Sequence, residues 1–289
     1  MTRLAVFHST VRAEEKLILE AARARSVAVS LIDIRECALD PAAFRVDFDV
    51  ALERSVSTVK GDYLAAFLES RGVPVVNPLR VARACEDKFQ TSLLLERAGV
   101  PTPRFAMAFD LERALGVVES FGGFPVVLKP PLGSWGRLLA KVNDRDALEA
   151  VLEHKDVLGT PPQKAYYLQE FIRKPGGRDI RAFCVEGETI AAISRTSEHW
   201  ITNTARGGTA AACPVTETIA GICRRASDAV GGGLLAVDLF ESGSGILVNE
   251  VNHTMEFRNS EGPTGVSISG AIIDHCLRVA KDGPMGIRS

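Results

Sequence analysis

The sequence predicts a mixed α and β protein made of three lobes, and three observations support this prediction. Roughly the first 80 residues alternate apolar strand segments with helical segments, which is typical of a small parallel sheet with covering helices. Pro101 and Pro103 then break the chain, and from about Arg178 onwards the pattern becomes that of β-hairpins. We therefore expect an α/β domain at residues 1–85 and two α+β lobes at 86–172 and 173–289.

The elements of the first lobe are predicted from apolar spacing. Strands are expected where apolar residues run together or alternate with polar ones, at residues 4–7, 27–33, 50–52 and 73–76. Helices are expected where apolar residues recur every three or four positions among good helix formers, at residues 13–25 and 61–70. Gly72 and Pro78 frame the last strand as turn and stop signals.

The second lobe combines short apolar strands with two helices. A helix at 86–98 has acidic residues in its first turn and Gly99 at its end, both typical of helix termini. Asp144 is the expected N-cap of a second helix at 144–154. The strands are expected at residues 124–129, 138–142 and 166–172.

The third lobe is predicted to contain two hairpins and two helices. Residues 180–185 and 189–194 flank the turn residues Glu186 and Gly187, as two antiparallel strands would. A second hairpin is expected from the apolar segments 235–240 and 246–251. The helices are expected at 216–230, where three glycines follow, and at 266–279.

Composition excludes several functional classes. Lys and Arg number 34 against 36 Asp and Glu, a net charge of −2, which argues against a protein that coats nucleic acid. No apolar run approaches the roughly 18–20 residues of a membrane helix, so no membrane partner is expected. The six cysteines form no C-x-x-C pair, which indicates small buried residues in a reducing compartment, and we expect a cytoplasmic protein.

Common catalytic motifs are missing from the sequence. It contains no G-x-x-x-x-G-K-[ST] loop, no G-x-G-x-x-G, no H-E-x-x-H and no G-x-S-x-G. These absences argue against a P-loop NTPase, a simple Rossmann dehydrogenase, a zincin and an α/β-hydrolase.

Three oxygen-bearing residues stand on the last predicted hairpin. Glu250 and Asn252 are two positions apart in one strand and therefore project to one face, while Asp238 on the partner strand can face them. Two carboxylates and an amide oxygen suit Mg²⁺, which keeps its other positions for water and phosphate. The same spacing is also typical of polar strand-end residues near solvent.

Two lysines stand where a nucleotide phosphate could be neutralised. Lys129 ends an apolar strand and precedes a loop with Gly133 and Gly136, whose backbone N–H groups could approach phosphate oxygens. Lys88 lies in the first turn of a predicted helix. Taken singly, each lysine is also typical of a solvated surface residue.

Taken in their order along the chain, these features resemble those of the ATP-grasp carboxylate–amine ligases. The resemblance is closest to the branch of that family that contains the ribosomal protein S6 glutamate ligases. Within that branch, three longer stretches resemble the LysX family, at residues 133–142, 199–208 and 250–257. The resemblance extends over essentially the whole chain. It implies an ATP-grasp fold with ATP held between the central and C-terminal lobes.

The resemblance also implies roles for individual residues. Mg²⁺ would be bound by Asp238, Glu250 and Asn252. The residues that would act in catalysis are Lys129, Arg195 and Arg206. Those that would bind ATP are Lys88, Lys129, Gly133, Ser134, Trp135, Gly136, Arg137, Gln169, Glu170, Phe171, Ile172, Arg178, Asp179 and Asn203. Those that would contact the amino-acid substrate are Arg195, Thr204, Ala205, Glu256, Phe257, Arg258, Asn259 and Ser260.

The reaction implied by the resemblance joins an amino acid to LysW, an acidic amino-group carrier protein. ATP would phosphorylate the side-chain carboxylate of the carrier's C-terminal glutamate, and the α-amino group of L-2-aminoadipate would attack the acyl phosphate. The pair Asn259 and Ser260 favours aminoadipate, and so lysine biosynthesis. The family resemblance further implies a homo-oligomer, either a dimer or a tetramer.

Two alternatives stay open at this point. The chain could be a glutamate ligase that acts on the same carrier in arginine biosynthesis or on a ribosomal protein tail. It could instead be a nucleotide-binding scaffold without catalysis, although the presence of both lysines and all three metal-ligand candidates argues against this. If the metal assignment is right, we expect Asp238→Ala and Glu250→Ala to abolish ADP release with little effect on folding.

Overall fold

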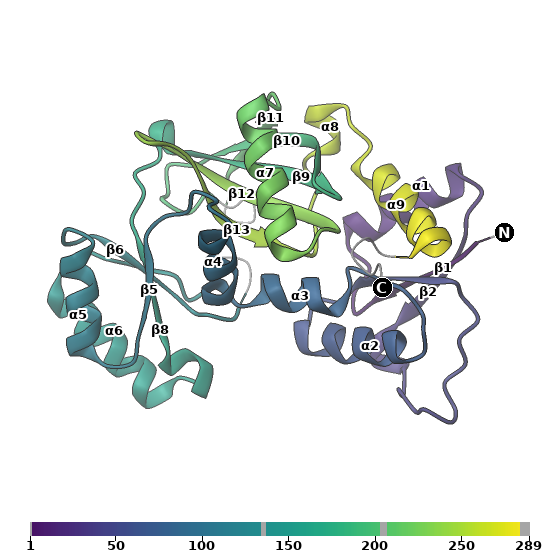
Figure 1. Cartoon of the computed structure of the whole chain (residues 1–289), viewed down its shortest axis with the longest axis horizontal. Coiled ribbons are helices and arrows are strands. Elements are labelled where there is room, and N and C mark those ends of the chain that lie inside the picture. The colour runs from purple at the N-terminus through teal and green to yellow at the C-terminus, as the bar shows by residue number, and fades with distance from the viewer. Residues whose placement is uncertain (1, 134–136, 203–206, 284–289) are drawn as a thin grey trace.

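The computed structural model describes residues 2–133, 137–202 and 207–283, and within them it contains one parallel and two antiparallel sheets (Figure 1). The parallel sheet lies at one end of the molecule and the sheet of the central lobe at the other, with the C-terminal sheet between them (Figure 1). The predicted mixture of α and β structure is therefore confirmed. No helix in the described ranges is long and apolar enough to cross a membrane.

The N-terminal sheet is parallel, as predicted. Its strand order is β2-β1-β3-β4, and every pairing in it is parallel. The central strand β1 is almost wholly buried because helices cover the sheet, which explains why its sequence is a continuous apolar run. The elements are β1 (Arg3–His8), α1 (Ala13–Ala24), β2 (Ala28–Asp33), the 3₁₀ turn η1 (Ile34–Glu36), β3 (Val50–Arg54), α2 (Thr58–Ser70) and β4 (Val75–Val76).

Two helices, rather than one, connect the first and central lobes. Helix α3 (Leu79–Glu86) ends at Asp87, where helix α4 (Lys88–Arg97) begins. Asp87 has an extended backbone, and its carboxylate accepts hydrogen bonds from the backbone N–H groups of Phe89 and Gln90, at 2.9 and 3.1 Å. The single helix predicted at 86–98 is therefore wrong at its start, because Asp87 is an N-cap and not a first-turn residue. As a result, Lys88 begins a helix at the edge of the cavity described below.

The central lobe is a four-stranded antiparallel sheet with two helices. Its strand order is β5-β8-β6-β7. The predicted N-cap is confirmed, since the Asp144 carboxylate accepts a hydrogen bond from the N–H of Ala147 at 2.8 Å. Strand β5 and helix α5 were not anticipated from the sequence. The elements are β5 (Phe105–Ala108), α5 (Leu111–Ser120), β6 (Val126–Lys129), β7 (Ala140–Val142), α6 (Arg145–Leu158), the turn η2 (Pro161–Lys164) and β8 (Tyr166–Glu170).

The C-terminal sheet contains both predicted hairpins. Its strand order is β11-β10-β9-β12-β13, and all its pairings are antiparallel. Helix α7 ends at Gly231, whose left-handed backbone (φ 101°) suits glycine. The elements are the turn η3 (Pro175–Gly177), β9 (Arg178–Val185), β10 (Glu188–Thr196), β11 (Thr209–Ala212), α7 (Glu217–Val230), β12 (Leu234–Ser242), β13 (Gly245–Asn252), α8 (Glu261–Thr264) and α9 (Ile268–Asp282).

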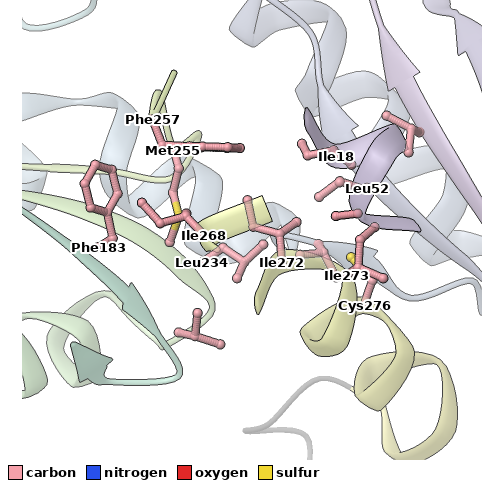
Figure 2. Close-up of a cluster of buried hydrophobic side chains, with 14 of the residues drawn as sticks. Ile18, Leu52, Phe183, Leu234, Met255, Phe257, Ile268, Ile272, Ile273 and Cys276 are labelled. Carbon is pink, nitrogen blue, oxygen red and sulfur yellow. The ribbon is translucent and has the colours of Figure 1, made fainter. Parts of the chain in front are cut away.

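The last helix, α9, joins the first lobe to the C-terminal sheet. It packs beside α1 and against β3 of the N-terminal lobe, and it also contacts β9 (Figure 1). Figure 2 shows Ile272 and Ile273 of α9 between Leu52 of the N-terminal sheet and Leu234 of the C-terminal sheet, in one hydrophobic cluster. This shared core fixes the N-terminal lobe against the sheet that carries the predicted metal ligands.

We expect Ile272→Ala to weaken this shared core. Ile272 is 1% exposed, so the substitution leaves a cavity, and the free energy of unfolding should fall by about 2–4 kcal/mol. Urea denaturation monitored by circular dichroism measures this change. Val157→Ala on α6 is the control, because Val157 is 72% exposed, and it should shift stability by less than about 0.5 kcal/mol. Equal effects of the two variants would contradict the role given to α9.

Candidate active site

One cavity brings together residues from all three sheets and is lined by most of the predicted site residues that the structure describes. Its wall includes Glu53 from β3, Lys129 from β6, Gln169 from β8, and Asp238 and Glu250 from β12 and β13. These residues are far apart in sequence and meet only because the lobes are folded against one another. The cavity is therefore the place where chemistry from several lobes can act on one ligand.

The strand register places the predicted metal ligands together. Asp238 of β12 lies directly opposite Glu250 of β13, and Asn252 lies opposite Ala236, two positions further along the same face. The Nδ2 atom of Asn252 donates a hydrogen bond to the backbone oxygen of Ala236 at 3.4 Å, which leaves its amide oxygen as an acceptor. Two carboxylates and an amide oxygen on one strand pair form a donor set that fits Mg²⁺.

Asp238 is also held by two arginines, of which Arg195 is buried and Arg181 is partly buried. Its two carboxylate oxygens accept bonds from Nε and Nη2 of Arg181, both at 2.8 Å, and Nη2 of Arg195 lies 3.1 Å from Oδ1. Burial by itself would raise the pKa of Asp238, but the charges of Arg181 and Arg195 outweigh it and hold the pKa at about 2. Arg181 was not among the predicted site residues, although it follows the predicted Asp179 by only two positions.

Lys129 is a buried cation at the end of β6. It is 7% exposed, and its Nζ donates a hydrogen bond to Oδ1 of Asn249 at 2.9 Å. Burial lowers the pKa of Lys129 to about 8, although the charge of Glu250 opposes this shift. A buried ammonium group with one neutral partner is a strong site for a phosphate oxygen. Asn249 was not predicted as a site residue, although it directly precedes Glu250.

Lys88 lies close to the same carboxylate from another element. Its Nζ donates a hydrogen bond to the backbone oxygen of Gly133 and lies 3.4 Å from Oε1 of Glu250. The loop that begins at Gly133 is therefore tied to the start of α4. Of the remaining predicted loop residues, Ser134, Trp135 and Gly136 lie outside the described ranges, and Arg137 is exposed and does not line the cavity.

The predicted adenine-binding segment also lines the cavity. Gln169 and Glu170 at the end of β8, followed by Phe171 and Ile172, contribute to its wall. Gln169 is buried, and its amide donates to the hydroxyl oxygen of Tyr167 at 3.3 Å. An adenine ring is bound by apolar side chains together with a few backbone hydrogen-bonding groups, and this segment can supply both.

Asp179 and Arg195 form a buried ion pair on the cavity wall. Nε of Arg195 donates to Oδ1 of Asp179 at 2.7 Å, and the hydroxyl of Thr202 donates to Oδ2. Lys174 lies 3.9 Å from the same carboxylate, and burial lowers its pKa. Asp179 therefore positions Arg195, which in turn reaches Asp238.

Several predicted residues do not lie in the cavity wall. Arg178 is exposed and pairs with Glu241, with 2.7 Å between Nε and Oε2. Glu256 does line the cavity, but Phe257 is fully buried in the core beside α9, and Arg258 and Asn259 are exposed. Ser260 is buried without lining the cavity. The residues that fall outside the described ranges are Asn203, Thr204, Ala205 and Arg206.

Three further carboxylates line the cavity and were not predicted. Glu53, Asp62 and Glu86 come from β3, α2 and α3, so no local motif joins them in sequence. Burial, followed by the charges of Asp62 and Glu53, raises the pKa of Glu86 to about 7. Its Oε1 lies 3.6 Å from Nε2 of His253, whose own pKa is lowered to about 4 by burial. His253 is thus neutral near pH 7 and does not offset the charge of Glu86.

The ion pairs of Asp238 with Arg181 and Arg195 predict that Asp238→Ala destabilises the protein, whereas the sequence alone predicted little effect on folding. This substitution leaves Arg181 and Arg195 without their shared carboxylate, so we expect the free energy of unfolding to fall by about 3 kcal/mol. Glu250→Ala removes one partly exposed ion pair with Lys88 and should cost less than about 1 kcal/mol. Chemical denaturation of the two variants measures the difference. Equal losses would contradict the structural role of the two arginines.

Glu86→Gln should stabilise the chain in a pH-dependent way. The carboxyl of Glu86 binds a proton near pH 7 when folded and near its usual 4.5 when unfolded, so stability falls as the pH rises between these values. The variant removes this loss, and we expect it to gain on the order of 1–2 kcal/mol at about pH 8 and nothing at about pH 4. Unfolding measured at both pH values, with exposed Glu119→Gln as control, tests this. A gain that does not depend on pH would contradict it.

Comparisons with known proteins identify both parts of the chain. Residues 4–84 match the LysX preATP-grasp domain, and residues 85–276 match the RimK-like ATP-grasp domain. The chain is 34% identical over 274 residues to the alpha-aminoadipate–LysW ligase LysX of Saccharolobus solfataricus, covering 93% of this chain and 99% of the relative. It is 33% identical over 279 residues to the glutamate–LysW ligase ArgX of Sulfurisphaera tokodaii, covering 94% of this chain and 97% of the relative.

A solved structure extends the likeness to the fold. The crystal structure of a RimK domain ATP-grasp protein from Sphaerobacter thermophilus superposes with a TM-score of 0.80 at 31% identity, covering 96% of this chain and 100% of that one. The predicted ATP-grasp fold is therefore confirmed. The chain belongs to the RimK-like ATP-grasp family of carboxylate–amine ligases.

Proposed function

We propose that this chain joins the α-amino group of L-2-aminoadipate to the side-chain carboxylate of the C-terminal glutamate of a LysW-type carrier protein, at the expense of ATP. One observation carries the proposal. Lys88 and Lys129 both lie near Glu250, and Glu250 is directly opposite Asp238 in the β12–β13 pair. This is an arrangement for a phosphate chain and a divalent cation. The carrier and the amino acid are suggested by the LysX relative, whose name specifies both.

The chemical need for ATP follows from the carboxylate. A carboxylate does not react with an amine at a useful rate because its leaving group would be oxide. Transfer of the γ-phosphoryl group to a carboxylate oxygen breaks its bond to ADP, which leaves, and gives an acyl phosphate. Attack by the neutral amine then forms the amide and releases phosphate and a proton. Catalysis of this kind depends on positioning and charge rather than on a covalent enzyme nucleophile.

The residues that line the cavity, together with Lys88 at its edge, have distinct roles in this proposal. Lys88 and Lys129 offset negative charge on the phosphates, and the segment from Gln169 to Ile172 holds the adenine. Asp238, Glu250 and Asn252 would hold Mg²⁺, which when bound neutralises phosphate oxygens. Arg195 is fixed by Asp179 and stands beside Asp238, where its guanidinium can stabilise charge on the transferred group.

Glutamate is the second candidate substrate, and two observations favour keeping it. The ArgX relative, named for glutamate, is nearly as similar to this chain as the LysX relative. In addition, Asn259 is exposed and does not line the cavity, so the pair that favoured aminoadipate has no visible contact with the site.

The intact mass of purified carrier tests the proposal directly. The carrier is incubated with the enzyme, Mg-ATP and either L-2-aminoadipate or L-glutamate, with ATP omitted as the control. We expect an adduct equal to aminoadipate less one water, formed only with ATP. An adduct with glutamate alone would overturn the substrate assignment, and the absence of any adduct would overturn the proposed function.

A further inference from the structure

Part of the cavity wall is acidic and has no role in the ATP and metal sites proposed above. Glu53, Asp62 and Glu86 line it from three different elements. We call these carboxylates, together with Ser55, the acidic wall. Its role can be stated only if the chain is the ligase proposed above, because it concerns the amine substrate.

The members of the acidic wall are connected by close contacts. Oε1 of Glu53 accepts a hydrogen bond from the backbone N–H of Ser55 at 2.6 Å. The carboxylate of Glu53 also packs against α2 at Gly61, where an added Cβ would lie only 2.9 Å from its carboxyl carbon. Gly61 precedes Asp62, and the charges of Asp62 and Glu53 both raise the pKa of Glu86. The three carboxylates therefore form one local group.

A buried hydroxyl in the same wall lacks a partner. Ser55 is 8% exposed and lines the cavity, and within the described part of the chain its Oγ has no hydrogen-bond partner. The buried Oε1 of Glu86 and Oδ1 of Asp62 accept no hydrogen bond from another described residue, and a proton shared between these two carboxyl groups contributes to the raised pKa of Glu86. Buried polar atoms are normally paired in native structures, so the unpaired hydroxyl of Ser55 beside these carboxyl groups indicates a ligand that forms hydrogen bonds here.

The charge of the wall selects a cationic ligand. Among the described Lys and Arg residues, the ion pair to this group comes from Arg83, whose Nε lies 3.2 Å from Asp62 at the exposed rim. Arg12 and Arg54 also act on Glu53 through their charge, but their ion pairs are with Glu15 and Glu256. The three carboxylates therefore outnumber the one arginine paired with them, which favours a positive charge and disfavours a carboxylate at this wall. A side-chain carboxylate of an amino acid would thus be directed away from this wall, and its amino group toward it.

The chemistry of the wall suits an ammonium group, and among the described residues the wall is not a metal site. No group of three Asp, Glu, His or Cys residues in the described ranges is close enough to hold a metal. An ammonium group needs three acceptors at hydrogen-bond distances of about 2.7–3.2 Å, which are longer than metal–oxygen bonds. The wall supplies carboxylate oxygens and a hydroxyl for this purpose.

The wall also lies beside the reaction centre. Glu86 is 3.6 Å from His253, which directly follows the metal-ligand candidate Asn252 in the chain. We propose that Glu53, Ser55, Asp62 and Glu86 form the binding site for the protonated amino group of the amine substrate. The cavity is then divided by charge, with the lysines facing phosphate and the acidic wall facing the amine.

Steady-state kinetics of Glu86→Gln and Asp62→Asn test this site. Each variant removes one negative charge from the wall, so we expect the KM for L-2-aminoadipate or L-glutamate, whichever the wild type uses, to rise about tenfold. The KM for ATP should change less than twofold. The matched control is Glu119→Gln on the exposed surface of α5, which should change neither value.

Inhibition by a substrate analogue separates amine binding from a general loss of structure. Adipate and glutarate lack the amino group, so their inhibition constants should be unchanged or lower in Glu86→Gln and Asp62→Asn. A parallel loss of analogue binding would show that the substitutions act through structure and would overturn the site. Thermal unfolding checks folding, and Asp62→Asn serves as the test if Glu86→Gln does not fold.

The outcomes distinguish this site from the proposed function. If the wild type forms an adduct but both variants keep its KM for the amino acid, the acidic wall does not bind the amine and the ligase assignment stands. If the wild type forms no adduct with either amino acid, the proposed function fails, and the amine-binding site fails with it.

Discussion

The pairing of β12 with β13 is the constraint on which the site depends. Its register sets Asp238 opposite Glu250, and a one-residue slip would send one of these side chains to the other face of the sheet. Apolar neighbours on both strands, such as Val237 and Val251, are fully buried and therefore fix that register. The polar chemistry of the site is thus positioned by hydrophobic packing on the opposite face.

Two carboxylates placed this close together need positive charge nearby. In this structure, Arg181 and Arg195 supply it to Asp238, and Lys88 supplies it to Glu250. These contacts hold the pKa of Asp238 low and fix both arginines beside it, where the proposed phosphate transfer would take place. A divalent cation would compete with these arginines for Asp238, so its binding and the position of the arginines are coupled.

Much of the fold and part of the site could be predicted from local sequence patterns. The parallel N-terminal strands, both C-terminal hairpins and the cap at Asp144 follow from rules that act over a few residues. The facing of Asp238 and Glu250 could be predicted because both stand on one hairpin. The helix start at Asp87 was misjudged because an acidic residue serves equally well in a first turn and as a cap.

The remaining features depend on contacts between distant segments. Helix α9 packs on the first lobe, and the acidic wall joins three elements that are far apart in sequence. Neither feature can be predicted from a local sequence pattern. Arg178 and Arg181 look alike in sequence, yet one pairs with Glu241 at the surface and the other with Asp238 in the cavity. Alternation along β9 places the two arginines on opposite faces of the sheet, but it does not say which face meets the cavity.

The central claim is that the β12–β13 pair holds a nucleotide through a divalent cation. Isothermal titration of a non-hydrolysable ATP analogue, with and without Mg²⁺, tests it in the wild type and in Glu250→Ala. The account predicts that Mg²⁺ tightens binding to the wild type at least about tenfold and that Glu250→Ala loses most of this gain while remaining folded. An equal gain from Mg²⁺ in both proteins would contradict the assignment of Glu250 to the metal site.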